Sequence, residues 1–175
     1  MVDGRVKEFT FGLAHEVTER VFVVQRAFRL NDTLPQEPAV PLRWQWQHGG
    51  WMAVDRLTGR VSPIDLPEFD AVYSVVSWYR DYAAYCGVSD DDKKIYAVVA
   101  QVGRRKPVVK WQIGEMKSPT RTQEFPESAC KQAEWQRTPA RVTFAPGESL
   151  KRTYVIHGHA VDLLTDESDD EEAEK

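Results

Sequence analysis

The chain has 175 residues, of which 42% are hydrophobic and 29% are charged, a composition typical of a soluble globular protein. A chain of this length normally forms one domain and buries enough surface to fold without a metal or a disulfide. The net charge of −4 comes from the last ten residues, which hold seven acids and one base, so the remaining residues carry +2. This balance excludes the strong basic field that is typical of nucleic-acid-binding proteins.

The first strands are predicted from alternation of apolar and polar residues. Residues 5–13 and 20–30 both alternate, and the density of β-branched residues in the second segment favours a strand over its rival, a helix. Residues 31–41 contain three prolines, which predicts a surface loop. Strands over residues 42–47 and 51–54 are then expected on either side of a turn at His48-Gly49-Gly50.

Two tight turns and one ambiguous segment follow. Asp55 to Gly59 predicts a turn in which Asp55 bonds the downstream backbone and Gly59 takes the left-handed conformation. The next strand, residues 60–66, contains Pro63, which indicates a sheet edge. Residues 71–86 fit either one helical face or two strands broken near Arg80-Asp81. The Val and aromatic content and the flanking hairpins favour two strands.

The C-terminal half predicts further hairpins. Gly103 to Pro107 forms a turn, and residues 114–136 predict a long loop with one short helix near residues 129–135. Arg141–Phe144 and Thr153–Ile156 flank Pro146-Gly147-Glu148-Ser149 as a hairpin. Residues 166–175 are expected to be a disordered acidic tail, because so many acids cannot bury apolar surface.

Two hairpins resemble those of a β-propeller blade. Leu57-Thr58-Gly59-Arg60-Val61 is similar to one blade turn, and Ser89 to Lys93 is similar to the Ser-Pro-Asp-Gly-Lys turn, with Asp90 in place of proline and Asp92 in place of glycine. The resemblance covers roughly 60 of the 175 residues, and a closed propeller needs at least about four blades. It implies hairpins of blade type and no catalytic residue.

These patterns together predict an all-β fold. We expect one domain over residues 1–165, built as a single antiparallel β-sandwich or a curled β-meander with blade-like hairpins and at most one short helix. A fragment that completes a propeller only by oligomerisation is the alternative. The oligomeric state stays open.

Two cysteines, Cys86 and Cys130, are too few for a disulfide scaffold and too far apart for a zinc site. They form either one disulfide or two ordinary buried thiols. One disulfide and a strand-rich composition favour an exported bacterial protein, periplasmic or extracellular, whose signal has been removed. A cytoplasmic protein is the alternative. No run of about 18 apolar residues predicts a transmembrane helix.

The chain offers little recognisable chemistry. His157 and His159 alternate along one strand face, as a metal pair requires, but two solvent-facing histidines explain them better. No nucleophile elbow, phosphate loop or dinucleotide fingerprint is present in the sequence. No catalytic residue and no cofactor are therefore expected.

An aromatic cluster is the best candidate for a binding surface. It lies in the window from Trp44 to Tyr85, and its candidate contact residues are Trp44, Trp46, Trp51, Trp78, Tyr79 and Tyr82. Core packing is the alternative role for these side chains. We therefore predict a non-catalytic binding or structural-interaction domain with a protein, peptide or carbohydrate partner and no nucleic acid. The rival class is a hydrolase whose carboxylates are scattered through the fold.

Overall fold

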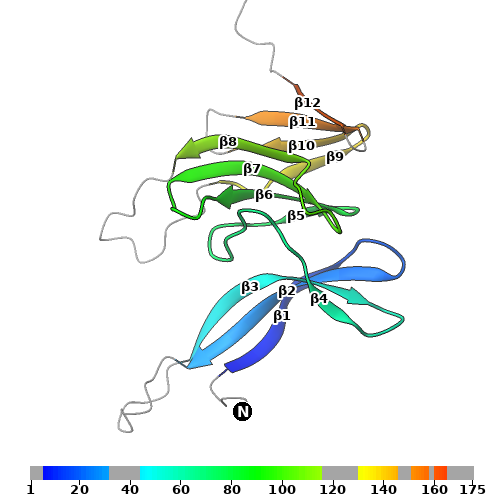
Figure 1. The fold of residues 1–175 in the computed structure, drawn as a ribbon, viewed down its shortest axis with the longest axis vertical. Helices are drawn as coiled ribbons and strands as arrows, with labels where there is room; N and C mark the ends of the chain where they lie inside the picture. The colour runs from blue at the N-terminus through cyan, green and yellow to red at the C-terminus, as the bar shows by residue number, and fades with distance from the viewer. Residues whose placement is uncertain (1–5, 32–43, 116–129, 146–150, 158–159, 165–175) are drawn as a thin grey trace, which may run out of the picture. The chain divides into compact units, whose positions relative to one another are not determined.

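The computed structural model describes residues 6–31, 44–115, 130–145, 151–157 and 160–164. These residues form twelve strands in three four-stranded antiparallel sheets, and they contain no helix (Figure 1). The all-β prediction is therefore confirmed. The chain divides into two compact units, Met1–Leu66 and Pro67–Lys175. Each unit is described by itself below, and the single domain over residues 1–165 stays a prediction.

The first unit is one antiparallel meander in the order β1-β2-β3-β4. Its strands are β1 (Val6–Glu16), β2 (Val21–Asn31), β3 (Trp44–Asp55) and β4 (Val61–Pro63). The strand over residues 20–30 is thus confirmed against the helix that was its rival. Pro63 lies in the edge strand β4, where its missing N–H costs no sheet hydrogen bond, as predicted.

The turn predicted at His48-Gly49-Gly50 is wrong, because β3 runs through it as one strand. The pairing of β2 with β3 shifts register at this point, so the two glycines form a bulge. A Cβ on Gly49 would lie 2.5 Å from Cε2 of Phe28, whereas one on Gly50 would meet nothing within 4 Å. The Phe28 ring therefore packs directly on the backbone at Gly49, where a side chain would collide with it.

The turn after β3 has the predicted chemistry. Oδ1 of Asp55 accepts hydrogen bonds from the N–H groups of Leu57 (2.9 Å) and Thr58 (3.1 Å), and Gly59 has a φ of 68°. Arg20, which directly precedes the neighbouring strand β2, forms an ion pair with Asp55. The side-chain hydrogen bond from Arg20 and the two backbone hydrogen bonds lower the pKa of Asp55 to about 2.

The second unit contains two further meanders, in the orders β5-β6-β7-β8 and β12-β11-β10-β9. The strands are β5 (Ser77–Tyr79), β6 (Tyr82–Val88), β7 (Lys94–Gln101), β8 (Val109–Glu115), β9 (Glu134–Arg137), β10 (Ala140–Phe144), β11 (Arg152–His157) and β12 (Ala160–Leu164). The break between β5 and β6 lies at Arg80-Asp81, as predicted. β10 and β11 pair as the expected hairpin.

The two sheets of the second unit share one hydrophobic core, the two-layer arrangement of a β-sandwich. Alternate residues of β6, β7, β8, β10 and β11 supply it, among them Ala97 and Val99 of β7, Phe144 of β10 and Ile156 of β11. A disulfide between Cys86 in β6 and Cys130 ahead of β9 lies within this core, with 6.1 Å between the two Cα atoms. Of the two states left open by the sequence, the structure has the disulfide.

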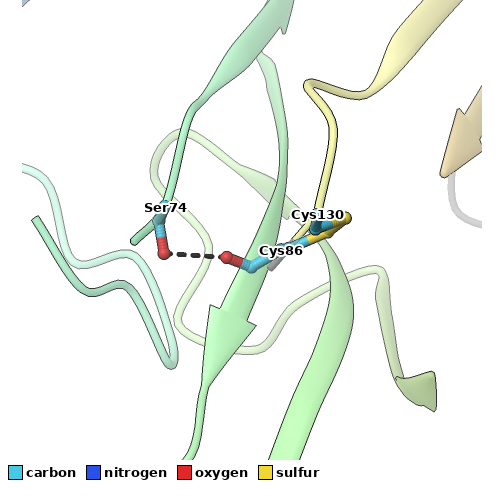
Figure 2. Close-up of a disulfide and its surroundings, with 3 residues drawn as sticks. All are labelled: Ser74, Cys86 and Cys130. Atoms are coloured by element: carbon cyan, nitrogen blue, oxygen red, sulfur yellow. Dashed lines mark hydrogen bonds between the residues drawn. A yellow bond between two sulfur atoms is a disulfide. The ribbon is translucent and has the colours of Figure 1, made fainter. Parts of the chain in front are cut away.

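The segment from Pro67 to Val76 covers the other face of β6. The Tyr85 hydroxyl donates to the Pro67 carbonyl at 2.6 Å, and the Ser74 hydroxyl donates to the Cys86 carbonyl at 2.8 Å. Figure 2 shows Cys86 between two partners, with its carbonyl toward Ser74 and its side chain toward Cys130. Because β6 is buried on both faces, its sequence is almost continuously apolar and lacks the alternation of a half-buried strand.

Two further predictions have an outcome in the second unit. Asp92 has a φ of 54° in the hairpin between β6 and β7, as expected for the glycine position of the turn. The short helix expected near residues 129–135 is wrong for the described residues, since residues 130–133 are not helical and Glu134 begins β9. Four predictions fall wholly or partly outside the described residues: the loop at 31–41, the turn at 146–149, His159 and the tail at 166–175.

Candidate functional site

One face of the first sheet carries a group of large side chains that we call the aromatic face. Residues directly opposite in paired strands point to the same side of a sheet. The register aligns Lys7, Arg29 and Trp46 in one row and Phe9, Ala27 and His48 in the next. Alternation along the strands adds the remaining members, so the aromatic face comprises Lys7, Phe9, Phe11, Arg29, Trp44, Trp46 and His48, arranged around Ala27.

The rings of the aromatic face are open to solvent. Phe9 is 45% exposed, Phe11 50% and Trp46 61%. Ala27, between the larger Phe9 and His48, is only 3% exposed. The rings contact one another in pairs, with 5.2 Å between the centroids of Phe9 and Trp46 and 4.2 Å between those of Phe11 and His48. The result is two ring pairs on one side of the sheet, each formed by one residue of β1 and one of β3.

The charge on the aromatic face is positive. The Arg29 guanidinium lies 4.9 Å from the centroid of the Trp44 ring, and exposed Lys7 stands directly opposite Arg29. Glu8 points to the other face of the sheet, where its carboxylate pairs with Arg26 at 2.5 Å. Within the described residues, the rows from Lys7 to Phe11 therefore place two cations and no carboxylate beside the rings.

The predicted contact residues divide between the two units. Trp44 and Trp46 belong to the aromatic face. Trp51 lies in the next row on the same side of the sheet, opposite Gln25 and Phe11, but it is only 8% exposed. Trp78, Tyr79 and Tyr82 lie in β5 and β6 of the second unit and are half-buried. The predicted window is therefore not one surface in either unit.

The tyrosines of the second unit belong to a packed corner. Tyr79 and Tyr82 pack on Trp135 of β9, with ring centroids 5.3 Å and 6.4 Å apart. Trp135 donates from Nε1 to the Ser77 carbonyl at 3.0 Å. These contacts join the β5 edge to β9, so core packing is the role that the structure supports for this part of the cluster.

Five members of the aromatic face were not among the predicted contact residues: the cations Lys7 and Arg29, and the ring-bearing residues Phe9, Phe11 and His48. The alternation of Phe9 and Phe11 is visible in the sequence, and it predicts a half-buried strand. Alternation shows that two side chains share a face. It does not show whether anything covers that face. The sequence does contain a signal for these residues. Phe9-Thr10-Phe11 and Trp44-Gln45-Trp46 both alternate aromatic and polar residues, and the strand between them carries the small residue Ala27.

The histidine pair forms no recognisable metal site in the described residues. His157 is exposed at the end of β11, and His159 lies outside the described part of the chain. Across the described ranges, no group of three His, Cys, Asp or Glu side chains has the geometry to hold a metal ion.

Comparisons with known protein families, with curated protein sequences and with solved structures found no match. Among the described residues, no helix has the length and apolar character needed to cross a membrane.

Proposed function

We propose that the protein is a non-catalytic binding domain and that the aromatic face is its contact surface. The observation that carries this proposal is the exposure of Phe9, Phe11 and Trp46 side by side on one sheet. Exposed contiguous apolar surface reduces solubility, and a partner that covers it is the simplest reason for a protein to keep it. Aromatic side chains are also the residues that most often dominate binding energy.

The aromatic face is built to bind without large rearrangement. β2 pairs along its length with β1 on one side and β3 on the other, so the strands that carry the rings are held by two ladders. Phe9 rests against Trp46, and Phe11 rests against His48. Side chains that are already ordered lose less conformational entropy when a ligand binds.

Two carboxylates have a lowered pKa. Hydrogen bonding lowers the pKa of Asp55, through Arg20, and of Asp91, through the Ser89 hydroxyl. A lowered pKa does not suit the proton donor of a glycosidase, so neither group is a candidate for that role. Asp55 and Asp91 act in turns, where they bind backbone N–H groups.

We further propose that the protein works in an oxidising, exported environment. The disulfide between Cys86 and Cys130 supports this location, because disulfides persist mainly outside the cytosol. Alkylation of free thiols before cell lysis tests it. Protection of both cysteines supports an oxidising location, and complete labelling contradicts it.

A propeller-like assembly is a second candidate role. The three sheets are consecutive four-stranded antiparallel meanders, which is the composition of propeller blades, and a propeller has four or more of them. Several copies of the chain would be needed to close the ring. The molar mass of the protein, measured by light scattering after size-exclusion chromatography, tests this role. A defined oligomer supports it, and a monomer contradicts it.

The binding function is tested on arrays of printed glycans and peptides with labelled protein. We expect a signal that is lost in the double variant Phe9→Ala/Trp46→Ala and kept in Trp111→Ala, a matched exposed tryptophan of β8 in the second unit. Binding that survives the double variant, or the absence of any signal that depends on these rings, contradicts the proposal.

A further inference from the structure

We propose that the ligand of the aromatic face is an acidic polysaccharide whose sugar units carry carboxylate groups. This inference rests on the proposed binding function and adds the chemical class of the ligand. The ligand has to match two features of the aromatic face. One is the exposed rings, and the other is positive charge with no carboxylate in the described rows from Lys7 to Phe11.

The rings fit the flat side of a sugar. Trp46 presents the most exposed ring of the group, and Phe9 and Phe11 present two more along β1. A pyranose ring has a face lined by C–H groups that packs on an aromatic ring, while its hydroxyls stay at the rim. His48, beside Phe11, supplies a polar group at hydrogen-bonding reach of such a rim.

The cations select for an acidic sugar. Arg29 and Lys7 stand opposite one another in the row that contains Trp46. A guanidinium stacked on a ring, as Arg29 is on Trp44, keeps its in-plane N–H donors available for a carboxylate. Glu8, the carboxylate nearest in sequence, is engaged with Arg26 on the other face. Within the described residues neither cation has a carboxylate partner, so a neutral sugar would leave both charges unused in binding.

The size of the face favours a narrow chain over a folded protein. Three strands about 4.8 Å apart, with about five residues each at roughly 3.3 Å, give an area of roughly 200–250 Å². A stable protein–protein contact covers about 800 Å² on each partner. A linear polysaccharide needs only a strip, and the rows from Lys7 to Phe11 provide one.

The test is titration calorimetry with polygalacturonate and with its fully methyl-esterified form, which keeps the sugar backbone and removes the charge. We expect binding to polygalacturonate that weakens as salt rises, and at least about tenfold weaker binding to the ester. Trp46→Ala, Arg29→Gln and Lys7→Gln should each weaken binding about tenfold. Two exposed residues of the second unit serve as matched controls, and Trp111→Ala and Arg105→Gln should leave binding unchanged.

The melting temperature of each variant shows whether it is folded. If Arg29→Gln does not fold, Lys7→Gln tests the same positive charge. Equal affinity for the ester overturns the acidic-sugar assignment, as does failure to bind polygalacturonate. Equal affinity for polyglutamate overturns the sugar part in favour of an acidic peptide. If these ligands fail while another array ligand still depends on Phe9 and Trp46, only the ligand class is wrong. If no ligand depends on them, the proposed function fails as well.

Discussion

The two units treat their aromatic side chains in opposite ways. In the second unit, Tyr85 is fully buried in β6, with its hydroxyl bonded to Pro67 and its ring against Phe69 at 5.7 Å. In the first unit, Phe9 and Trp46 contact each other at a similar distance of 5.2 Å and yet stay in solvent. Ring contacts alone therefore do not distinguish a core from a binding surface.

The covering segment makes the difference. In the second unit, residues 67–76 lie on the outer face of β6 and are bonded to it at Val88 and Cys86, while the inner face packs on the second sheet. In the first unit, the aromatic face keeps three exposed rings. We therefore propose that the aromatic residues of β6 stabilise the fold and that the exposed aromatic residues of β1 and β3 bind a partner. The following predictions test that division.

The largest effect on stability is expected from the disulfide of the second unit. Replacing Cys86 and Cys130 together by alanine opens a loop with a sequence separation of 44 residues. In the chain-entropy model this lowers the free energy of unfolding by about 4 kcal/mol, measured by urea denaturation. The wild-type protein treated with dithiothreitol should show the same loss. An unchanged midpoint under both conditions would mean that the bond does not support the fold.

The next largest effect on stability is expected where the segment of residues 67–76 packs on β6. A Cβ on Gly87 would lie 2.8 Å from both the Cβ and the carbonyl oxygen of Glu68. Gly87→Ala therefore forces the segment of residues 67–76 to move away from β6. We expect a loss of about 1–3 kcal/mol in unfolding free energy. Gly114→Ala is the matched control, because the new Cβ would make only an ordinary contact of 3.9 Å with Ile95. Equal stability of the two variants would show that this segment moves freely.

A smaller, pH-dependent effect is expected in the first unit. The pKa of Asp55 lies at about 2, below its ordinary value of 3.8, because Arg20 and the turn backbone bind the carboxylate. The stabilisation is therefore fully present above about pH 4 and disappears as the pH falls through about 2. Asp55→Asn should lower the melting temperature at pH 7 and converge with the wild type at pH 2. A constant difference across that range would contradict the ion pair as its cause.

The smallest effect is expected in the hairpin between β6 and β7. Asp92 has a φ of 54°, a conformation that glycine adopts without strain. Asp92→Gly should leave stability unchanged or raise it by up to about 1 kcal/mol in chemical denaturation. Asp92→Ala, which lacks that freedom, should be less stable than Asp92→Gly. The reverse order would show that the Asp92 side chain makes a bond that matters.

Local features of the fold were predictable because their causes are local. Alternation located β1 and β2, and the Asp55–Gly59 and Asp92 turns followed from the conformations that Asp and Gly tolerate. The turn at Gly49-Gly50 was misjudged because the need for glycine comes from Phe28 on the neighbouring strand. Nothing in the sequence around Gly49 records that contact.

The candidate site was only half predictable for a related reason. The density of aromatic residues between Trp44 and Tyr85 groups Trp44 and Trp46 with Trp78 and Tyr79. The structure separates them into different units. Whether a face is covered depends on irregular segments such as residues 67–76 folding back over a strand, so burial cannot be derived from the spacing of aromatic residues.

The double variant Phe9→Ala/Trp46→Ala tests the central claim most directly, with its unfolding free energy and its ligand binding measured on the same preparation. Because both rings are about half exposed, the account predicts a change in stability of no more than about 1 kcal/mol together with loss of binding. A loss of several kcal/mol, of the size expected for a buried ring, would show that the aromatic face is core. Unchanged binding with unchanged stability would show that it is not the contact surface.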